Sequence, residues 1–104
     1  MDNNKIAVIT GAARGNGRAT AFSLGKSGYS LYLTDLNSQE LEEAITDMKN
    51  EGIDASGGVY DASIISDAKV LVEDVIKNFG RIDILVNNAG ASKPVKFPDV
   101  DEQT

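Results

Sequence analysis

The sequence predicts an α/β fold, a doubly wound parallel sheet of four strands in the order 3-2-1-4 with three helices. Two observations lead to this prediction. Short apolar runs alternate with segments of helical periodicity, as in repeated βαβ units. A glycine-rich segment also follows the first apolar run directly, where a strand would turn into a helix. Right-handed crossovers then place helices on both faces of one small domain over residues 1–104.

The first strand is expected at residues 5–10, where apolar residues run continuously as in a strand that is buried on both faces. After the glycine-rich loop, a helix over residues 17–27 would carry small residues on one face and end at Gly28. The second strand is expected at residues 30–35, rich in β-formers.

The second helix has the clearest periodicity in the chain. Counted from Leu41, apolar residues recur at i+3, i+4 and i+7, with acidic residues between them. Asn37 and Glu40 form the pattern of a capping box before this helix, and Gly52 supplies its C-terminal stop.

The third strand lies within residues 54–61 and has the weakest pattern. Gly57 and Gly58 lower its β propensity, which an edge position in the sheet would tolerate. A third helix follows over residues 66–78, with its apolar residues on one face and Gly80 at its end.

A fourth strand is expected at residues 81–88, with its outer edge left open. Residues 91–104 contain both prolines, Pro94 and Pro98, and are expected to form a loop that leads toward a further helix.

Composition excludes several classes of function. The chain carries 10 basic and 16 acidic residues, a formal charge of −6, and no basic cluster, so nucleic acids and anionic membranes are poor partners. It contains neither cysteine nor histidine, which excludes a disulfide framework and a structural zinc site. The start resembles no signal peptide and no apolar run is long enough for a membrane span, so a cytoplasmic location is expected.

The glycine-rich loop over residues 10–17 has the surroundings of a dinucleotide-binding site. Gly11, Gly15 and Gly17 permit tight turns and a close approach of the backbone to a ligand. The first N–H groups of the following helix are unpaired and lie at the positive end of its dipole. A pyrophosphate is therefore expected to bind there.

Asp35 is the second element of the predicted site, 18 residues after Gly17 at the end of the second strand. A carboxylate at this position can accept hydrogen bonds from both ribose hydroxyls of an adenosine and repels a 2′-phosphate. It therefore predicts a site for NAD in preference to NADP, and its neighbour Leu36 is expected to belong to the same cofactor site. The alternative is a solvated turn aspartate beside Asn37.

At this point the residues resemble the short-chain dehydrogenase/reductase family. Its glycine motif is Thr-Gly-x-x-x-Gly-x-Gly and its fourth strand ends in Asn-Asn-Ala-Gly, which residues 10–17 and 87–90 match. The resemblance covers essentially the whole chain. It implies a Rossmann-type fold, a nicotinamide dinucleotide cofactor, and hydride exchange with an alcohol or carbonyl substrate.

The resemblance also assigns roles to residues after the second strand. Asp61 and the backbone of Ala62 would lie against the adenine ring. Near the ribose, the cofactor cleft would be lined by Asn88, Ala89 and Gly90. Asn87 is expected instead to brace the sheet by bonding to backbone.

Three polar residues near the loop complicate this assignment. Asn16 stands where the family has Ile or Leu, and either bonds to the cofactor or is solvated. A basic residue at the position of Arg14 is similar to family members that favour NADP, whereas Asp35 is similar to those that favour NAD. Asp35 is expected to decide the preference, because its carboxylate repels the 2′-phosphate of NADP. Arg18 is expected to be solvated.

The residues that carry out the family's reaction have no match here. The family uses a Tyr-x-x-x-Lys pair with a serine and an asparagine, but the residues four positions after Tyr29, Tyr32 and Tyr60 are not lysines. No catalytic residue is therefore expected. The chain is interpreted as the cofactor-binding part of an NAD-dependent oxidoreductase, truncated relative to the family and homo-oligomeric when complete. The alternative is a non-catalytic nucleotide-binding or interaction module.

Overall fold

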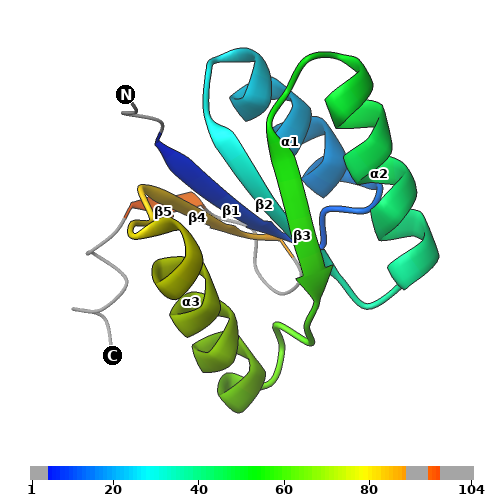
Figure 1. The fold of residues 1–104 in the computed structure, drawn as a ribbon. Helices are drawn as coiled ribbons and strands as arrows, with labels where there is room; N and C mark the ends of the chain where they lie inside the picture. Colours follow the sequence, from blue (N-terminus) through cyan, green and yellow to red (C-terminus); the bar gives the residue numbers. More distant parts are fainter. Residues whose placement is uncertain (1–4, 89–93, 97–104) are drawn as a thin grey trace.

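The computed structural model describes residues 5–88 and 94–96 and arranges them as one sheet between two helical layers (Figure 1). In chain order the elements are β1 (Ile6–Thr10), α1 (Gly15–Lys26), β2 (Ser30–Asp35), α2 (Ser38–Asn50), β3 (Ala55–Val59), α3 (Ile65–Phe79), β4 (Ile84–Asn87) and β5 (Pro94–Lys96). No helix among the described residues is long and apolar enough to span a membrane.

The sheet has the order β3-β2-β1-β4-β5. The first four strands pair in parallel, which confirms the predicted order 3-2-1-4, and β3 lies at the edge as its glycines suggested. The prediction that residues 91–104 form a loop is wrong at residues 94–96, where β5 pairs antiparallel with β4 and covers its outer edge. The helix expected beyond them lies outside the described residues.

β5 was not predicted from the sequence, for two physical reasons. Three residues are too few to show a period-two pattern. Pro94 also argues against a strand, yet it is tolerated as the first residue of an edge strand, where its missing N–H breaks no ladder.

The capping box before α2 is only half formed. The Asn37 side chain accepts a hydrogen bond from the backbone N–H of Glu40 at 2.9 Å, as predicted. The backbone N–H of Asn37, however, donates to Asp35 Oδ1 at 3.2 Å, and the Glu40 carboxylate faces Arg14. The second half of the prediction is wrong because Asp35 supplies the acceptor that a capping box takes from Glu40.

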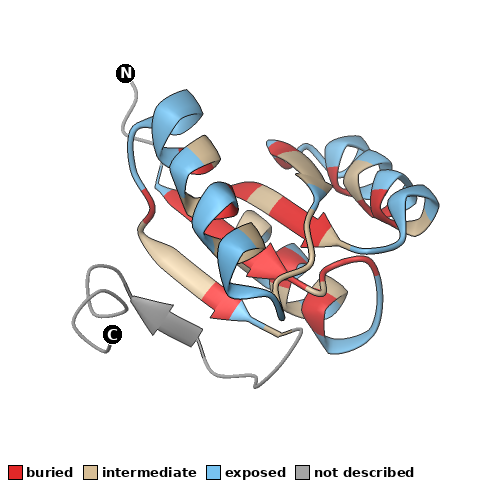
Figure 2. Cartoon of the chain, turned by 90° about the horizontal axis from the view of Figure 1, so that it is seen from below, coloured by how far each residue is buried: buried red, intermediate tan, exposed pale blue. Residues whose placement is uncertain are grey.

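The core lies on both faces of the central strands, and Figure 2 shows buried residues concentrated there. Alternate residues of β1 point to opposite faces, so Ala7 and Ile9 pack with α1 and α2 while Ile6 and Val8 pack with α3. Burial on both faces explains why this strand is apolar throughout rather than alternating.

Asp83 joins the start of β1 to the segment before β4. Its Oδ2 accepts from the backbone N–H of Ile6 at 2.8 Å, and its own N–H donates to the Ile6 carbonyl at 2.8 Å. Arg81 donates to both carboxylate oxygens, at 2.9 and 2.7 Å. The Arg81 guanidinium and then the Ile6 N–H lower the pKa of Asp83, while burial acts in the opposite direction.

We expect Asp83→Ala to lower the free energy of unfolding at pH 7 by about 1–2 kcal/mol, because the buried N–H of Ile6 loses its acceptor. The pKa of Asp83 is lower in the folded than in the unfolded protein, so this stabilisation is full above the unfolded value and is lost as the pH falls through the folded value. Urea unfolding at pH 7, 5 and 3 should show that the difference in free energy of unfolding between wild type and Asp83→Ala becomes smaller as the pH falls. A difference that stays constant down to pH 3 contradicts this linkage.

Candidate functional site

The residues predicted to bind a ligand gather where parallel strands end. The glycine-rich loop follows β1, Asp35 is the last residue of β2, and Asn88 directly follows β4. Asp61 follows β3 by two residues. Because the carboxyl ends of parallel strands share one edge of a sheet, this edge is where ligands of such folds bind.

The three glycines of the loop have two different reasons to be glycine. Gly11 and Gly15 adopt positive φ angles of 60° and 62°, which side chains rarely tolerate. Gly17 is needed for space, since a Cβ there would lie 2.0 Å from the Gly11 carbonyl oxygen and 2.9 Å from Asn88 Nδ2. The first turn of α1 thus lies directly against the loop and the end of β4.

The N-terminus of α1 is open to an anion. Its N-cap residue, Arg14, has extended backbone and makes no side-chain capping bond, and no acidic residue stands in the first turn. Gly15 and Asn16 are exposed, whereas Gly17 is buried. The first-turn N–H groups and the helix dipole together suit a phosphate, and no described atom lies within 4 Å of where a Cβ on Gly15 would stand, which leaves room for its approach.

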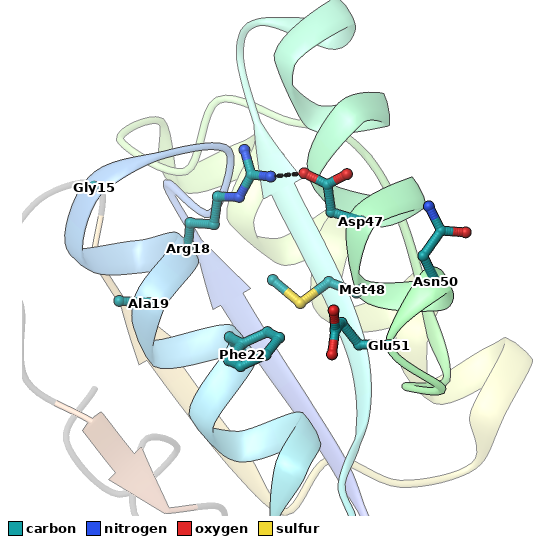
Figure 3. A pocket seen from close by; sticks show the side chains of 8 residues that line it. All are labelled: Gly15, Arg18, Ala19, Phe22, Asp47, Met48, Asn50 and Glu51. Atoms are coloured by element: carbon teal, nitrogen blue, oxygen red, sulfur yellow. Dashed lines mark hydrogen bonds and ion pairs between the residues drawn. The ribbon is translucent and has the colours of Figure 1, made fainter.

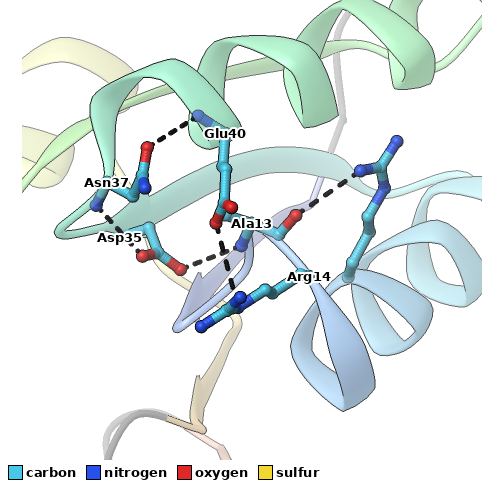
Figure 4. A network of polar contacts seen from close by, with 6 residues as sticks. Ala13, Arg14, Asp35, Asn37 and Glu40 are labelled. Carbon is cyan, nitrogen blue, oxygen red and sulfur yellow. Dashed lines mark hydrogen bonds and ion pairs between the residues drawn. The ribbon is translucent and has the colours of Figure 1, made fainter.

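The Asp35 carboxylate is fixed against the glycine-rich loop, as Figure 4 shows. Its Oδ2 accepts from the backbone N–H of Ala13 at 3.0 Å and its Oδ1 from that of Asn37 at 3.2 Å. A carboxylate offers about four acceptor positions, so both oxygens retain capacity for hydroxyl donors. The bond to Ala13 was missed in the sequence because backbone donors leave no residue pattern.

The remaining predicted site residues differ in how far they are buried. Leu36 is exposed and Ala62 is half-buried. Asp61 is half-buried and closes the turn before α3, accepting from the backbone N–H and the hydroxyl of Ser63 at 3.1 and 2.6 Å. Ala89 and Gly90 lie outside the described residues.

The two asparagines at the end of β4 have different surroundings. The Asn87 Oδ1 accepts from the Thr10 hydroxyl at 3.0 Å and so links β4 to β1. The brace was expected to run to backbone, and that detail is wrong because the hydroxyl lies within reach of the strand end. Asn88 is half-buried with its amide beside Gly17, so it lies in the candidate site.

The prediction that Arg18 is solvated is wrong, because its side chain forms an ion pair. Its guanidinium pairs with Asp47 of α2, which lies 29 residues away in sequence (Figure 3). It also donates to the Ala13 carbonyl at 3.5 Å. Only the packing of α1 beside α2 brings Arg18 and Asp47 together, so no local pattern predicts the contact.

A groove of about 600 Å³ runs between α1 and α2 (Figure 3). Ion pairs lie along it, Arg18 with Asp47 and Lys26 with Glu51, the latter at 3.4 Å. Of the predicted site residues it includes Gly15. Among residues 5–88 and 94–96, no group of three acidic side chains is arranged to hold a metal ion.

Tyr32 and Tyr60 form a polar contact on the α3 face that no sequence pattern predicted. The Tyr60 hydroxyl donates to Asp74 Oδ2 at 2.7 Å and lies 3.2 Å from the Tyr32 hydroxyl. Burial, followed by the hydrogen bonds with Tyr32 and Asp74, raises the pKa of Tyr60. A phenol that is harder to deprotonate than usual is a poor general base.

Comparison with known proteins identifies the family of the chain. The family model described as short chain dehydrogenase matches residues 5–104. The chain is 38% identical to 7α-hydroxysteroid dehydrogenase of Paraclostridium sordellii over 97% of its residues, and 34% identical to a 3-oxoacyl-(acyl-carrier-protein) reductase of Staphylococcus aureus over 89%. It spans only 39% and 38% of the lengths of these two relatives.

Solved structures give the same result. An actinorhodin polyketide ketoreductase with NADPH matches with a TM-score of 0.79 and 31% identity, covering 85% of this chain and 34% of that one. A short-chain dehydrogenase/reductase from Burkholderia phymatum with NAD matches with a TM-score of 0.75 and 30% identity, covering 81% and 30%. With the family model matching nearly every residue, the chain belongs to the short-chain dehydrogenase family.

Proposed function

We propose that this chain binds a nicotinamide dinucleotide and forms the cofactor-binding part of an oxidoreductase that acts on an alcohol or carbonyl substrate. The observation that carries the proposal is the hydrogen bond between Asp35 and Ala13, which fixes a carboxylate beside an uncapped helix N-terminus. One ligand with a ribose and a pyrophosphate would use both features. When bound, its nicotinamide supplies hydride exchange.

Each part of the site would hold a different part of the cofactor. The pyrophosphate would take the first N–H groups of α1, with Gly15 allowing its approach and Gly17 keeping the helix against the loop. The ribose hydroxyls would donate to Asp35. We further propose Asp61 and Ala62 for the adenine, and the segment of Asn88, Ala89 and Gly90 for the cleft beside the ribose, in line with the family motif.

We propose that NAD is preferred over NADP. Similar solved structures include complexes with NAD and with NADPH, so family membership does not decide between them. The fixed Asp35 carboxylate supports NAD because a 2′-phosphate would lie close to it, and like charges a few ångströms apart repel by about 1 kcal/mol or more. Arg14, which would favour NADP, is highly exposed, so its charge is screened by solvent.

Asp35→Ala tests this preference. We expect NAD affinity to fall about tenfold or more, because hydrogen bonds to a charged acceptor contribute about 1.5–3 kcal/mol, while NADP affinity is retained or rises. Calorimetric titration of both cofactors measures the change. Asp35→Asn is the matched control, since it keeps the shape and one of the two acceptor oxygens but removes the charge. Equal affinities for NAD and NADP in the wild-type chain would contradict the proposal.

A homo-oligomeric complete protein and a cytoplasmic location remain predictions from the sequence. The alternative is a non-catalytic nucleotide-binding or interaction module; the titrations above apply unchanged to the first, whereas the second would bind neither dinucleotide.

A further inference from the structure

Arg14 and Glu40 close a ring of contacts around the candidate ribose site. The Arg14 Nε lies 3.8 Å from Glu40 Oε1, and the two side chains point toward one another in Figure 4. The backbone N–H of Glu40 is bound by Asn37, whose own N–H is bound by Asp35, whose other oxygen holds Ala13. The ring therefore joins the glycine-rich loop to the first turn of α2.

The position of Glu40 is set by the backbone rather than by its own side chain. Because Asn37 caps α2 through the Glu40 N–H at 2.9 Å, the first turn of the helix is fixed relative to Asp35. Glu40 is the acidic residue of that turn, and its side chain is 39% exposed. A second carboxylate is thus placed on the same side of the loop as Asp35.

The pairing changes what Arg14 offers to a ligand. An unpaired arginine at this loop would attract the doubly charged 2′-phosphate of NADP, because guanidinium groups bind phosphate well. With Glu40 facing it, the Arg14 charge is partly neutralised, and a phosphate would have to replace the carboxylate as its partner. NAD lacks this phosphate and loses nothing by the pairing.

We infer that Glu40 is a specificity-determining residue, which disfavours a 2′-phosphorylated cofactor by holding Arg14. The inference rests on the proposed function. Its effect is modest, since the Arg14 side chain is 81% exposed and an ion pair in contact with water is screened by solvent and salt.

The test compares Glu40→Gln with Glu43→Gln in calorimetric titrations of the full chain with NAD and with NADP. Glu43→Gln is the matched control, because it removes the same charge from the same helix. Glu43 is exposed and lies with Thr46 and Asp47 in another groove, away from Arg14. We expect Glu40→Gln to raise the ratio of NADP to NAD affinity about threefold at low salt, less at high salt, and Glu43→Gln to leave it nearly unchanged.

A third variant, Arg14→Gln, identifies the route of the effect. In its background Glu40→Gln should change the ratio by a smaller factor, because the guanidinium that Glu40 holds is absent. An equal effect of Glu40→Gln and Glu43→Gln, or an effect undiminished by Arg14→Gln, overturns the inference. Wild-type chain that binds neither dinucleotide overturns the proposed function as well, which separates the two failures.

Discussion

Gly17→Ala is expected to abolish dinucleotide binding and to lower the free energy of unfolding by about 2 kcal/mol or more. The added Cβ would lie 2.0 Å from the Gly11 carbonyl oxygen, and backbone cannot turn aside as a side chain can. The first turn of α1 must therefore move away from the loop. That displacement separates the helix N–H groups from Asp35, so one ligand no longer reaches both.

Gly25→Ala is the matched control for this experiment. It lies in the same helix, and its Cβ would also be too close to a neighbour, at 2.5 Å, but that neighbour is the Ile53 side chain at the opposite end of α1. Urea unfolding should show destabilisation of both variants, whereas calorimetry should show lost NAD binding only for Gly17→Ala. Wild-type affinity in Gly17→Ala would contradict the role given to the contact between Gly17 and Gly11.

The 104-residue chain is expected to show no turnover with NAD and a panel of alcohols. Within the described residues the three tyrosines are engaged elsewhere, Tyr29 packed against the α1 and α2 core and Tyr32 and Tyr60 on the α3 face. A missing general acid-base group costs about 10²–10⁴ in rate, and missing substrate positioning costs more.

The predicted absence of turnover is checked by following the absorbance of reduced nicotinamide while the chain is incubated with NAD and an excess of alcohol. Gly17→Ala serves as its control, because contaminating activity would survive the substitution whereas activity of this site would not. Repeated turnover that persists through re-purification and disappears in Gly17→Ala would show that the chain carries its own proton-transfer group.

The parts of the fold that the sequence predicted are those that leave a local pattern. The apolar run of β1, the period of α2 and the glycine at the end of α3 each reflect one element's own environment. Order of the parallel strands followed from the handedness of crossovers, which needs no knowledge of side chains. The positions of Gly17 and Asp35 were also predictable from local pattern, since Gly17 lies in the first turn of a helix and Asp35 ends a strand.

What the sequence did not predict depends on contacts between elements. Arg18 meets Asp47, and Glu40 turns from its capping role to Arg14, only because α1 and α2 pack side by side. The hydrogen bond from Ala13 to Asp35 involves a backbone donor whose direction is set by the loop conformation. β5 is stabilised by its neighbour β4 rather than by its own three residues.

The central position of β1 has a consequence for synthesis on the ribosome. One edge of this strand pairs with β2 soon after it emerges, but the other must wait for β4, and the contacts from Ile6 to Asp83 and from Thr10 to Asn87 each span 77 residues. Such long loops close slowly, and an unpaired strand edge invites aggregation meanwhile. A nascent chain that has not yet reached residue 88 lacks the amide that lies beside Gly17, so the loop meets the end of β4 only once nearly the whole sheet has been made.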